Sequence, residues 1–202
     1  MKTLTNVRIG RILSATIREK VKEMKKSTLY TMTSCALMAA LMCVLCPVSV
    51  PIGPIPVSMG IFIILLTVYV LGTWRAMVSY GVYLLLGAVG IPVFSGFQGG
   101  LAKLVGPTGG YLIGFWLMVL IGGLIMERGK RNLWITMAGM AAGVAADYVV
   151  GTTWFVLQTK CAVSYALTVC VYPFIPFDIG KIVLAVLLGS LVYRALQRAK
   201  LQ

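Results

Sequence analysis

The apolar positions of this chain fall into long runs that charged residues rarely interrupt. Between Lys26 and Arg75 there is no charge, and a proline-rich stretch, PVSVPIGPIPVSM, divides this interval. Because a helix needs about 20 residues at a rise of about 1.5 Å to cross the hydrocarbon core, the interval predicts two helices with a short connection. In all, the pattern predicts six spans, at residues 28–46, 60–71, 76–90, 106–126, 133–157 and 174–193.

Composition supports a membrane protein. The 202 residues are 59% hydrophobic and 11% charged, which is more apolar surface than one soluble core can bury. We therefore expect an all-α membrane protein, a six-helix bundle with an outward-facing ligand pocket. The chain has no histidine and shows no pairing of a nucleophile with a base, so we expect neither an enzyme nor a metal site. The five cysteines lie mostly in apolar runs and are interpreted as small hydrophobic residues.

Lysine and arginine fall unevenly on the two sides of the predicted bundle. One side holds eight basic residues before the first helix, Arg75, three in ERGKRN and three at the C-terminus. The opposite side holds only Lys103, Lys160 and Lys181. The positive-inside rule then places both termini in the cytoplasm, in a multi-pass protein of the cell membrane. The net charge of +13 is explained by this orientation in the membrane, and a nucleic acid partner is not needed to account for it.

The charge pattern also divides the chain into segments. We expect a basic cytoplasmic segment at 1–27, a membrane domain at 28–196 and a cytoplasmic tail at 197–202. The first segment has the charges and apolar residues of an amphipathic helix on the inner membrane surface, and equally those of a solvated tail. It lacks the compact apolar region of a signal peptide.

An aspartate and a lysine stand at the start of the sixth run, in the stretch VYPFIPFDIGK. Asp178 and Lys181 are three residues apart and share one helix face, because residues i and i+3 are neighbours. The helix dipole favours Asp178 in the first turn and disfavours Lys181 there. The pair predicts a ligand contact, and the alternative is a local ion pair that reaches toward the interface.

Three segments resemble, in order and spacing, the BioY family of biotin transporters: PIGPIPVSMGIFIILLTVYVLG, YLLLGAVGIPVFSGFQGGLAKLVGPTGGYLIGF and YPFIPFDIGK. The resemblance covers residues 30–196. It implies the substrate-binding S component of an energy-coupling factor (ECF) transporter, which captures biotin from outside beneath the loops joining its helices. It also implies a transmembrane T component and two ATPase subunits as partners, although some members are thought to work alone. The chain has no phosphate loop, so ATP is expected only at partner subunits and no cofactor is expected here.

Biotin presents a ureido ring with two N–H donors and one carbonyl, an apolar thiolane ring and a valerate tail with a carboxylate. Asp178 is predicted to accept a ureido N–H, and Lys181 to bind the ureido carbonyl or the carboxylate. Gln98 is placed by the resemblance at a polar contact with either end. Lys103, in the same loop, is a candidate for the carboxylate, and equally a solvated loop charge.

The stretch GPTGGY predicts a helix start where the backbone approaches the ligand, through Thr108, Gly109, Gly110 and Tyr111. Close helix packing is the alternative role for the two glycines.

The fifth run carries further candidates. Tyr148 and Trp154 are candidates for the wall around the thiolane ring, with packing or interfacial anchoring as the alternative. Asp147 is a carboxyl in the middle of a span for which the resemblance offers no role. It is interpreted as an unexplained polar contact within the bundle.

Ala36 and Ala40 place small residues four apart on the first predicted helix, which lets another helix approach closely. The resemblance implies that this face docks the T component, and internal packing is the alternative. At the level of function, biotin uptake competes with uptake of a different vitamin and with a non-catalytic structural membrane subunit.

Overall fold

The structure is a computed structural model that describes residues 28–50 and 56–199. The chain divides into two compact units, residues 1–34 and 35–202, which are taken separately. Of the first unit, only the opening turns of the helix Thr28–Leu45 are described. The predicted basic segment 1–27 lies outside the described residues, as do residues 200–202 of the predicted tail.

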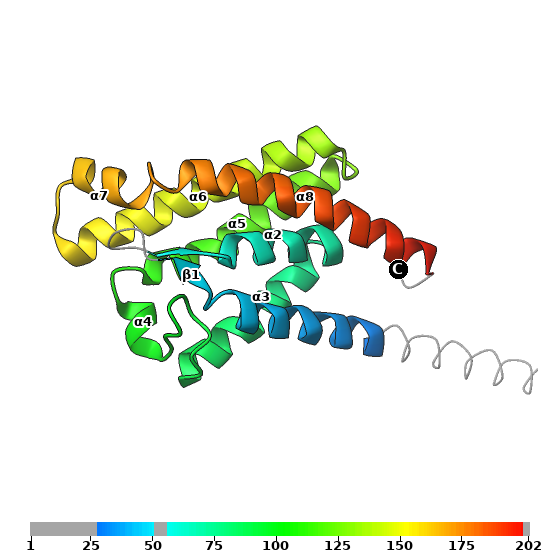
Figure 1. Cartoon of the computed structure of the whole chain (residues 1–202), viewed down its shortest axis with the longest axis horizontal. Helices are drawn as coiled ribbons and strands as arrows, with labels where there is room; N and C mark the ends of the chain where they lie inside the picture. The colour runs from blue at the N-terminus through cyan, green and yellow to red at the C-terminus, as the bar shows by residue number, and fades with distance from the viewer. Residues whose placement is uncertain (1–27, 51–55, 200–202) are drawn as a thin grey trace, which may run out of the picture. The chain divides into compact units, whose positions relative to one another are not determined.

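The second unit is almost entirely helical, and its elements can be followed by colour in Figure 1. A short antiparallel ribbon pairs β1 with β2, with Ser49 opposite Ser58. The elements after the helix Thr28–Leu45 are β1 (Ser49–Val50), β2 (Val57–Ser58), α2 (Gly60–Leu71), α3 (Thr73–Val89), α4 (Leu101–Val105), α5 (Gly109–Arg128), α6 (Leu133–Thr159), α7 (Val163–Cys170) and α8 (Ile175–Arg198).

Four described helices are long and apolar enough to cross a membrane: Thr28–Leu45, α5, α6 and α8. Their outward-facing side chains are also apolar, with Leu157, Val149 and Leu191 each more than 60% exposed. A soluble protein rarely exposes so many large apolar side chains on its helices, whereas lipid solvates them. The all-helical membrane class expected from the sequence is therefore confirmed.

Helix α2 is short for a membrane span. Its 12 residues extend about 18 Å, against about 30 Å of hydrocarbon. All of its residues except Leu66 are buried, and α2 packs against α3, α5 and α8. Because protein rather than lipid surrounds α2, this short helix does not need to span the full hydrocarbon thickness. The polar loops at its ends can lie below the membrane surface.

Helices α5 and α6 form the most extensive helix pair, and glycines set their spacing. A Cβ added at Gly143 would lie 2.7 Å from the Met118 carbonyl oxygen, and one at Gly122 would lie 3.5 Å from that of Gly139. Small residues let two backbones approach closely, as in other membrane helix pairs. This close approach brings Asp147 of α6 against Gly114 of α5, where an added Cβ would overlap the carboxyl oxygen Oδ1.

The connection after α3 is a folded loop rather than an open one. Phe94 and Gln98 bond to each other through their backbones, and the Gly96 N–H donates to the Pro47 carbonyl at 3.1 Å. The loop turns at residues with positive φ, including Gly90 (113°) and Gly96 (75°). As a result, the Phe94 ring is fully buried and the loop is tied to the end of the first helix.

The predicted helix limits differ from the observed limits at charged residues and at proline. Helices α3, α5 and α8 include Arg75, Arg128 and Arg198, because a charge at the membrane surface does not end a helix. Helix α5 begins at Gly109 instead of Gly106, since Gly106 and Pro107 form the turn before it. The short helices α4 and α7 were not predicted from the apolar pattern.

Candidate functional site

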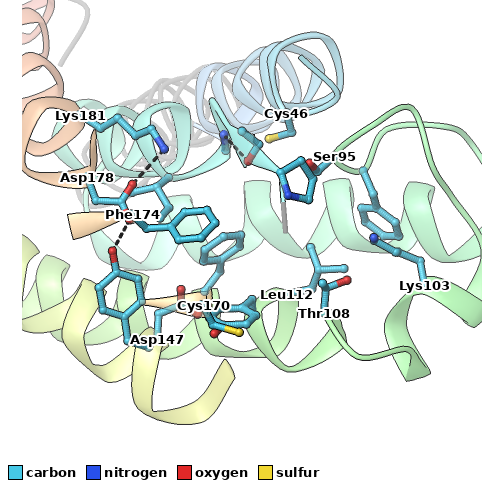
Figure 2. Close-up of a pocket in the computed structure, with 18 of the residues that line it drawn as sticks. Cys46, Ser95, Lys103, Thr108, Leu112, Asp147, Cys170, Phe174, Asp178 and Lys181 are labelled. Carbon is cyan, nitrogen blue, oxygen red and sulfur yellow. Dashed lines mark hydrogen bonds and ion pairs between the residues drawn. The ribbon is translucent and has the colours of Figure 1, made fainter. Parts of the chain in front are cut away.

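A cavity of about 100 Å³ lies within the second unit. Its lining comes from all the helices from α2 to α8 and from the ribbon and the loop after α3. Six residues predicted for the site line this cavity: Lys103, Thr108, Tyr111, Tyr148, Asp178 and Lys181. Figure 2 shows Lys181 and Lys103 at opposite ends of the cavity lining.

At one end, Asp178 is the centre of a three-residue network. The Lys181 ammonium donates to Asp178 Oδ1 at 2.9 Å, and the Tyr148 hydroxyl donates to Asp178 Oδ2 at 2.5 Å. Asp178 is 2% exposed, and the Lys181 side chain is 11% exposed. The ion pair expected from the i, i+3 spacing is thus present, and each charge offsets the cost of burying the other.

The position of Asp178 follows from the start of α8. Pro176 lies in the first turn, where its missing N–H costs no hydrogen bond, and Asp178 is the acidic residue of that turn. The N-cap residue is Phe174 and no side-chain cap bond is present, so the Asp178 carboxylate bonds Lys181 and Tyr148 instead of capping the helix. The Asp178 carboxylate is therefore rigidly held, with lone pairs left for a ligand donor.

The start of α5 forms another part of the lining. Thr108 is the N-cap residue but its side chain bonds no helix N–H, and it lines the cavity. The Tyr111 hydroxyl lies 3.0 Å from Thr152 Oγ1 on α6, which fixes the tyrosine ring against the cavity. Tyr111 thus offers a flat apolar wall whose polar end is already satisfied.

Lys103 lies on α4 at the other end of the cavity. Burial lowers the pKa of the Lys103 ammonium from its ordinary value. Lys103 forms no ion pair within the described residues, where the only ion pair joins Lys181 to Asp178. A cation held in a partly dry site without a counter-ion is suited to an anionic ligand group.

Four other predicted site residues lie outside this lining. Gln98 is exposed and borders a separate open hollow, which Lys103 and Thr108 also line. The Trp154 indole N–H donates to the Gly106 carbonyl at 3.0 Å, and a Cβ at Gly110 would overlap the Trp154 side chain. Gly109 lies against the Leu104 carbonyl in the same way. The observed contacts of Trp154, Gly109 and Gly110 are packing contacts with neighbouring parts of the protein.

Ala36 and Ala40 are exposed on their helix, whereas Cys35 and Ala39 on its other face are buried. The two small residues therefore lie on the accessible face of this helix, opposite its buried face.

Two polar side chains line the cavity without a site role assigned from the sequence: Ser95, which was missed, and Asp147, which was interpreted as an unexplained polar contact. Ser95 lines the cavity, and its buried Oγ has no hydrogen-bond partner in the described residues. Asp147 also lines the cavity and has a buried, unpartnered Oδ1. Ser95 lies in the stretch PVFSGFQGG, directly before Gly96, and a single loop hydroxyl of this kind gives no sequence signal that it is buried.

The arrangement suits reversible binding of a small elongated molecule. One end of the cavity offers a carboxylate with an ammonium and a phenol, the other offers a second ammonium, and aromatic rings of Tyr111, Phe115 and Phe174 line the space between. No group of metal-binding side chains is found in the described residues. The fold and the cavity define a helical membrane protein with a candidate site for a small molecule.

Comparisons with known proteins agree with this class. The BioY family model matches residues 19–198, so the chain belongs to the BioY family. It is 40% identical to the biotin transporter BioY of Thermotoga maritima over 70% of this chain and 83% of the relative. It is 34% identical to the biotin transporter BioY2 of Lactococcus lactis over 86% of this chain and 95% of the relative.

A solved structure matches as well, the crystal structure of the S component for biotin from an ECF-type ABC transporter. The TM-score is 0.76 with 28% sequence identity, over 81% of this chain and 90% of the other. The match therefore extends to the arrangement of the helices and not only to short motifs.

Proposed function

We propose that this protein binds biotin and carries out its uptake across the cell membrane, as the S component of an ECF transporter. The observation that carries the proposal is the cavity, whose two ends match the two polar ends of biotin. Membership of the BioY family and the structural match to a biotin S component support the same ligand.

The ureido ring is assigned to the Asp178 end. The Asp178 carboxylate can accept a ureido N–H while it keeps its bonds to Lys181 and Tyr148. The Lys181 ammonium has three N–H donors and uses one on Asp178, so it can also donate to the ureido carbonyl. Binding at this end adds hydrogen bonds without breaking the ion pair.

The valerate carboxylate is assigned to Lys103. The cavity runs from Lys181 to Lys103, with apolar side chains between them for the thiolane ring and the methylene chain. The carboxylate would supply the counter-ion that Lys103 lacks among the described residues. Gln98, next to Lys103 at the open hollow, is positioned to contact the ligand on its way in.

The proposed topology has six spans with both termini in the cytoplasm. Helices α2 and α3, although shorter than the other four, complete the count. The fifteen basic residues assigned to one side support this orientation. In this orientation the cavity opens outward, since Lys103 and Lys160 lie on the side opposite the basic residues.

The proposed partners are a T component and two ATPase subunits, which supply the ATP hydrolysis. Ala36 and Ala40 form the proposed docking face for the T component, because both are small and exposed. Replacing Ala36 or Ala40 with Trp is expected to abolish partner-dependent uptake and leave biotin binding unchanged. Leu37→Trp is the control, because Leu37 is exposed on an adjacent face of the same helix. Equal uptake by Ala36→Trp, Ala40→Trp and wild type would contradict this docking face.

The function is tested by a binding panel on the purified full-length protein in detergent. Radiolabelled biotin is expected to bind at submicromolar concentration and to stay bound in excess thiamine or riboflavin. Displacement by another vitamin would reassign the substrate within the same class of transporter. No binding at micromolar biotin would contradict the proposed function.

A further inference from the structure

Asp147 is a buried acid inside the cavity that the assigned contacts leave unused. It lies on α6, one residue before Tyr148, and it is 1% exposed. Its Oδ1 has no hydrogen-bond partner, and the only ion pair within the described residues is the one between Lys181 and Asp178. A buried carboxyl oxygen without a hydrogen-bond partner is rare in proteins and is costly to keep.

The packing of α5 shows where one oxygen of Asp147 lies. Oδ1 is turned against Gly114, where an added Cβ would overlap it. Since Asp147 lines the cavity, Oδ2 is the oxygen that can reach a ligand. Figure 2 shows Asp147 at the same end of the cavity as Asp178 and Lys181, which lie on α8.

The surroundings of Asp147 also indicate its charge state. A carboxylate without a cation is far more costly to bury than an uncharged carboxyl. Lys181, the cation at this end, already pairs with Asp178. We therefore take Asp147 as uncharged, with Oδ1 as its carbonyl oxygen against Gly114 and Oδ2 as an O–H donor toward the cavity.

We infer that Asp147 is a further ligand contact, in which its O–H donates a hydrogen bond to the ureido carbonyl of biotin. The inference rests on the proposed function and adds to it a second binding residue at the ureido end. Asp178 and Asp147 then have different tasks. Asp178 accepts from a ureido N–H, and Asp147 donates to the carbonyl of the same ring.

The test compares three forms of the full-length protein with two ligands. Asp147→Asn keeps an N–H donor in place of the O–H, whereas Asp147→Leu removes the donor and keeps the approximate volume. The ligands are biotin and 2-thiobiotin, in which sulfur replaces the ureido oxygen and accepts hydrogen bonds more weakly. Dissociation constants are measured by calorimetry, and thermal midpoints of the ligand-free protein in detergent are measured beside them.

Asp147→Leu is expected to weaken biotin binding about tenfold, and Asp147→Asn by less than about threefold. The preference for biotin over 2-thiobiotin should shrink in Asp147→Leu and persist in Asp147→Asn. The ligand-free thermal midpoint of Asp147→Leu should be unchanged or higher, because an unpartnered buried polar group has been removed. A structural role alone would lower that midpoint without altering the ligand preference.

Three results would overturn the inference. The first is an Asp147→Leu variant that binds biotin as tightly as the wild type. The second is an equal loss of biotin affinity in Asp147→Leu and Asp147→Asn. The third is the same preference for biotin over 2-thiobiotin in all three forms. Each leaves the proposed function intact, because the wild type would still bind biotin. Absence of biotin binding by the wild type would overturn the proposed function and this inference together.

Discussion

The site depends on charges that are held inside the protein at some cost. Asp178 and Lys181 offset each other at one end of the cavity, and the Tyr148 hydroxyl occupies the second carboxylate oxygen. Lys103 stands at the other end with no anionic partner among the described residues. A carboxylate bound at this end would therefore favour the ammonium form of Lys103.

The lowered pKa of Lys103 predicts a pH dependence of binding. Burial favours the neutral amine in the free protein, whereas a bound carboxylate favours the ammonium. As pH rises through the pKa of free Lys103, binding must take up a proton. The affinity for biotin should then fall by up to about tenfold per pH unit. Titration calorimetry between neutral and alkaline pH measures this slope.

Lys103→Met provides the control for that slope. It should bind biotin more weakly at neutral pH and lose most of the dependence above it, because the titrating group is gone. If wild type and Lys103→Met show the same slope, Lys103 is not the carboxylate contact.

The Asp178–Lys181 pair could be predicted from the sequence more readily than the packing. Asp178 and Lys181 were found because charges in an apolar run stand out, and the i, i+3 spacing determines their pairing. Trp154 and Gly110 fit both a binding role and a packing role, and only the tertiary contacts show that they pack on each other. Ser95 was missed because a single hydroxyl in a loop gives no sequence signal of burial.

At the scale of elements, glycines decide how closely the helices around the cavity approach. Gly114 lets α5 lie against Asp147, and Gly143 lets α6 lie against the Met118 carbonyl. The helix runs were predictable from hydropathy, because lipid requires long apolar segments. The short helices α4 and α7 were not, since their formation depends on contacts with other elements rather than on an apolar pattern.

Gly114→Ala should destabilise the protein and weaken biotin binding. The added Cβ meets the Asp147 carboxyl, and overpacking of this kind costs about 1–3 kcal/mol. Gly180→Ala is the matched control, because a Cβ at Gly180 on α8 meets nothing within 4 Å. It should be neutral or stabilising by up to about 1 kcal/mol. Thermal midpoints in detergent compare the two variants, and equal midpoints would contradict the close α5–α6 packing described here.

For the whole molecule, the fold supplies an apolar exterior around a cavity that is lined largely by apolar side chains, with charged groups at its two ends. The exposed side chains of α8 include Phe177, Leu187 and Leu191, whereas its Asp178 is buried. This arrangement places the candidate cavity inside a bundle with an apolar exterior. The direction of transport then depends on the side to which the cavity opens.

The proposed orientation predicts opposite labelling at two loops. In a version with the five natural cysteines replaced by alanine, Lys160→Cys should react with an impermeant maleimide in intact cells. Lys130→Cys, between α5 and α6, should react only after lysis, because the positive-inside rule places it in the cytoplasm. Labelling of Lys130→Cys in intact cells would reverse the topology.

The most direct test of the central claim is the affinity of the purified protein for biotin, measured for wild type beside Asp178→Asn and Lys181→Met. The account predicts tight binding by wild type. Each variant should lose at least about tenfold in affinity, because a charge-assisted contact is removed and its buried partner is left uncompensated. Wild-type affinity in both variants would contradict the site, and the absence of biotin binding by the wild type would contradict the function itself.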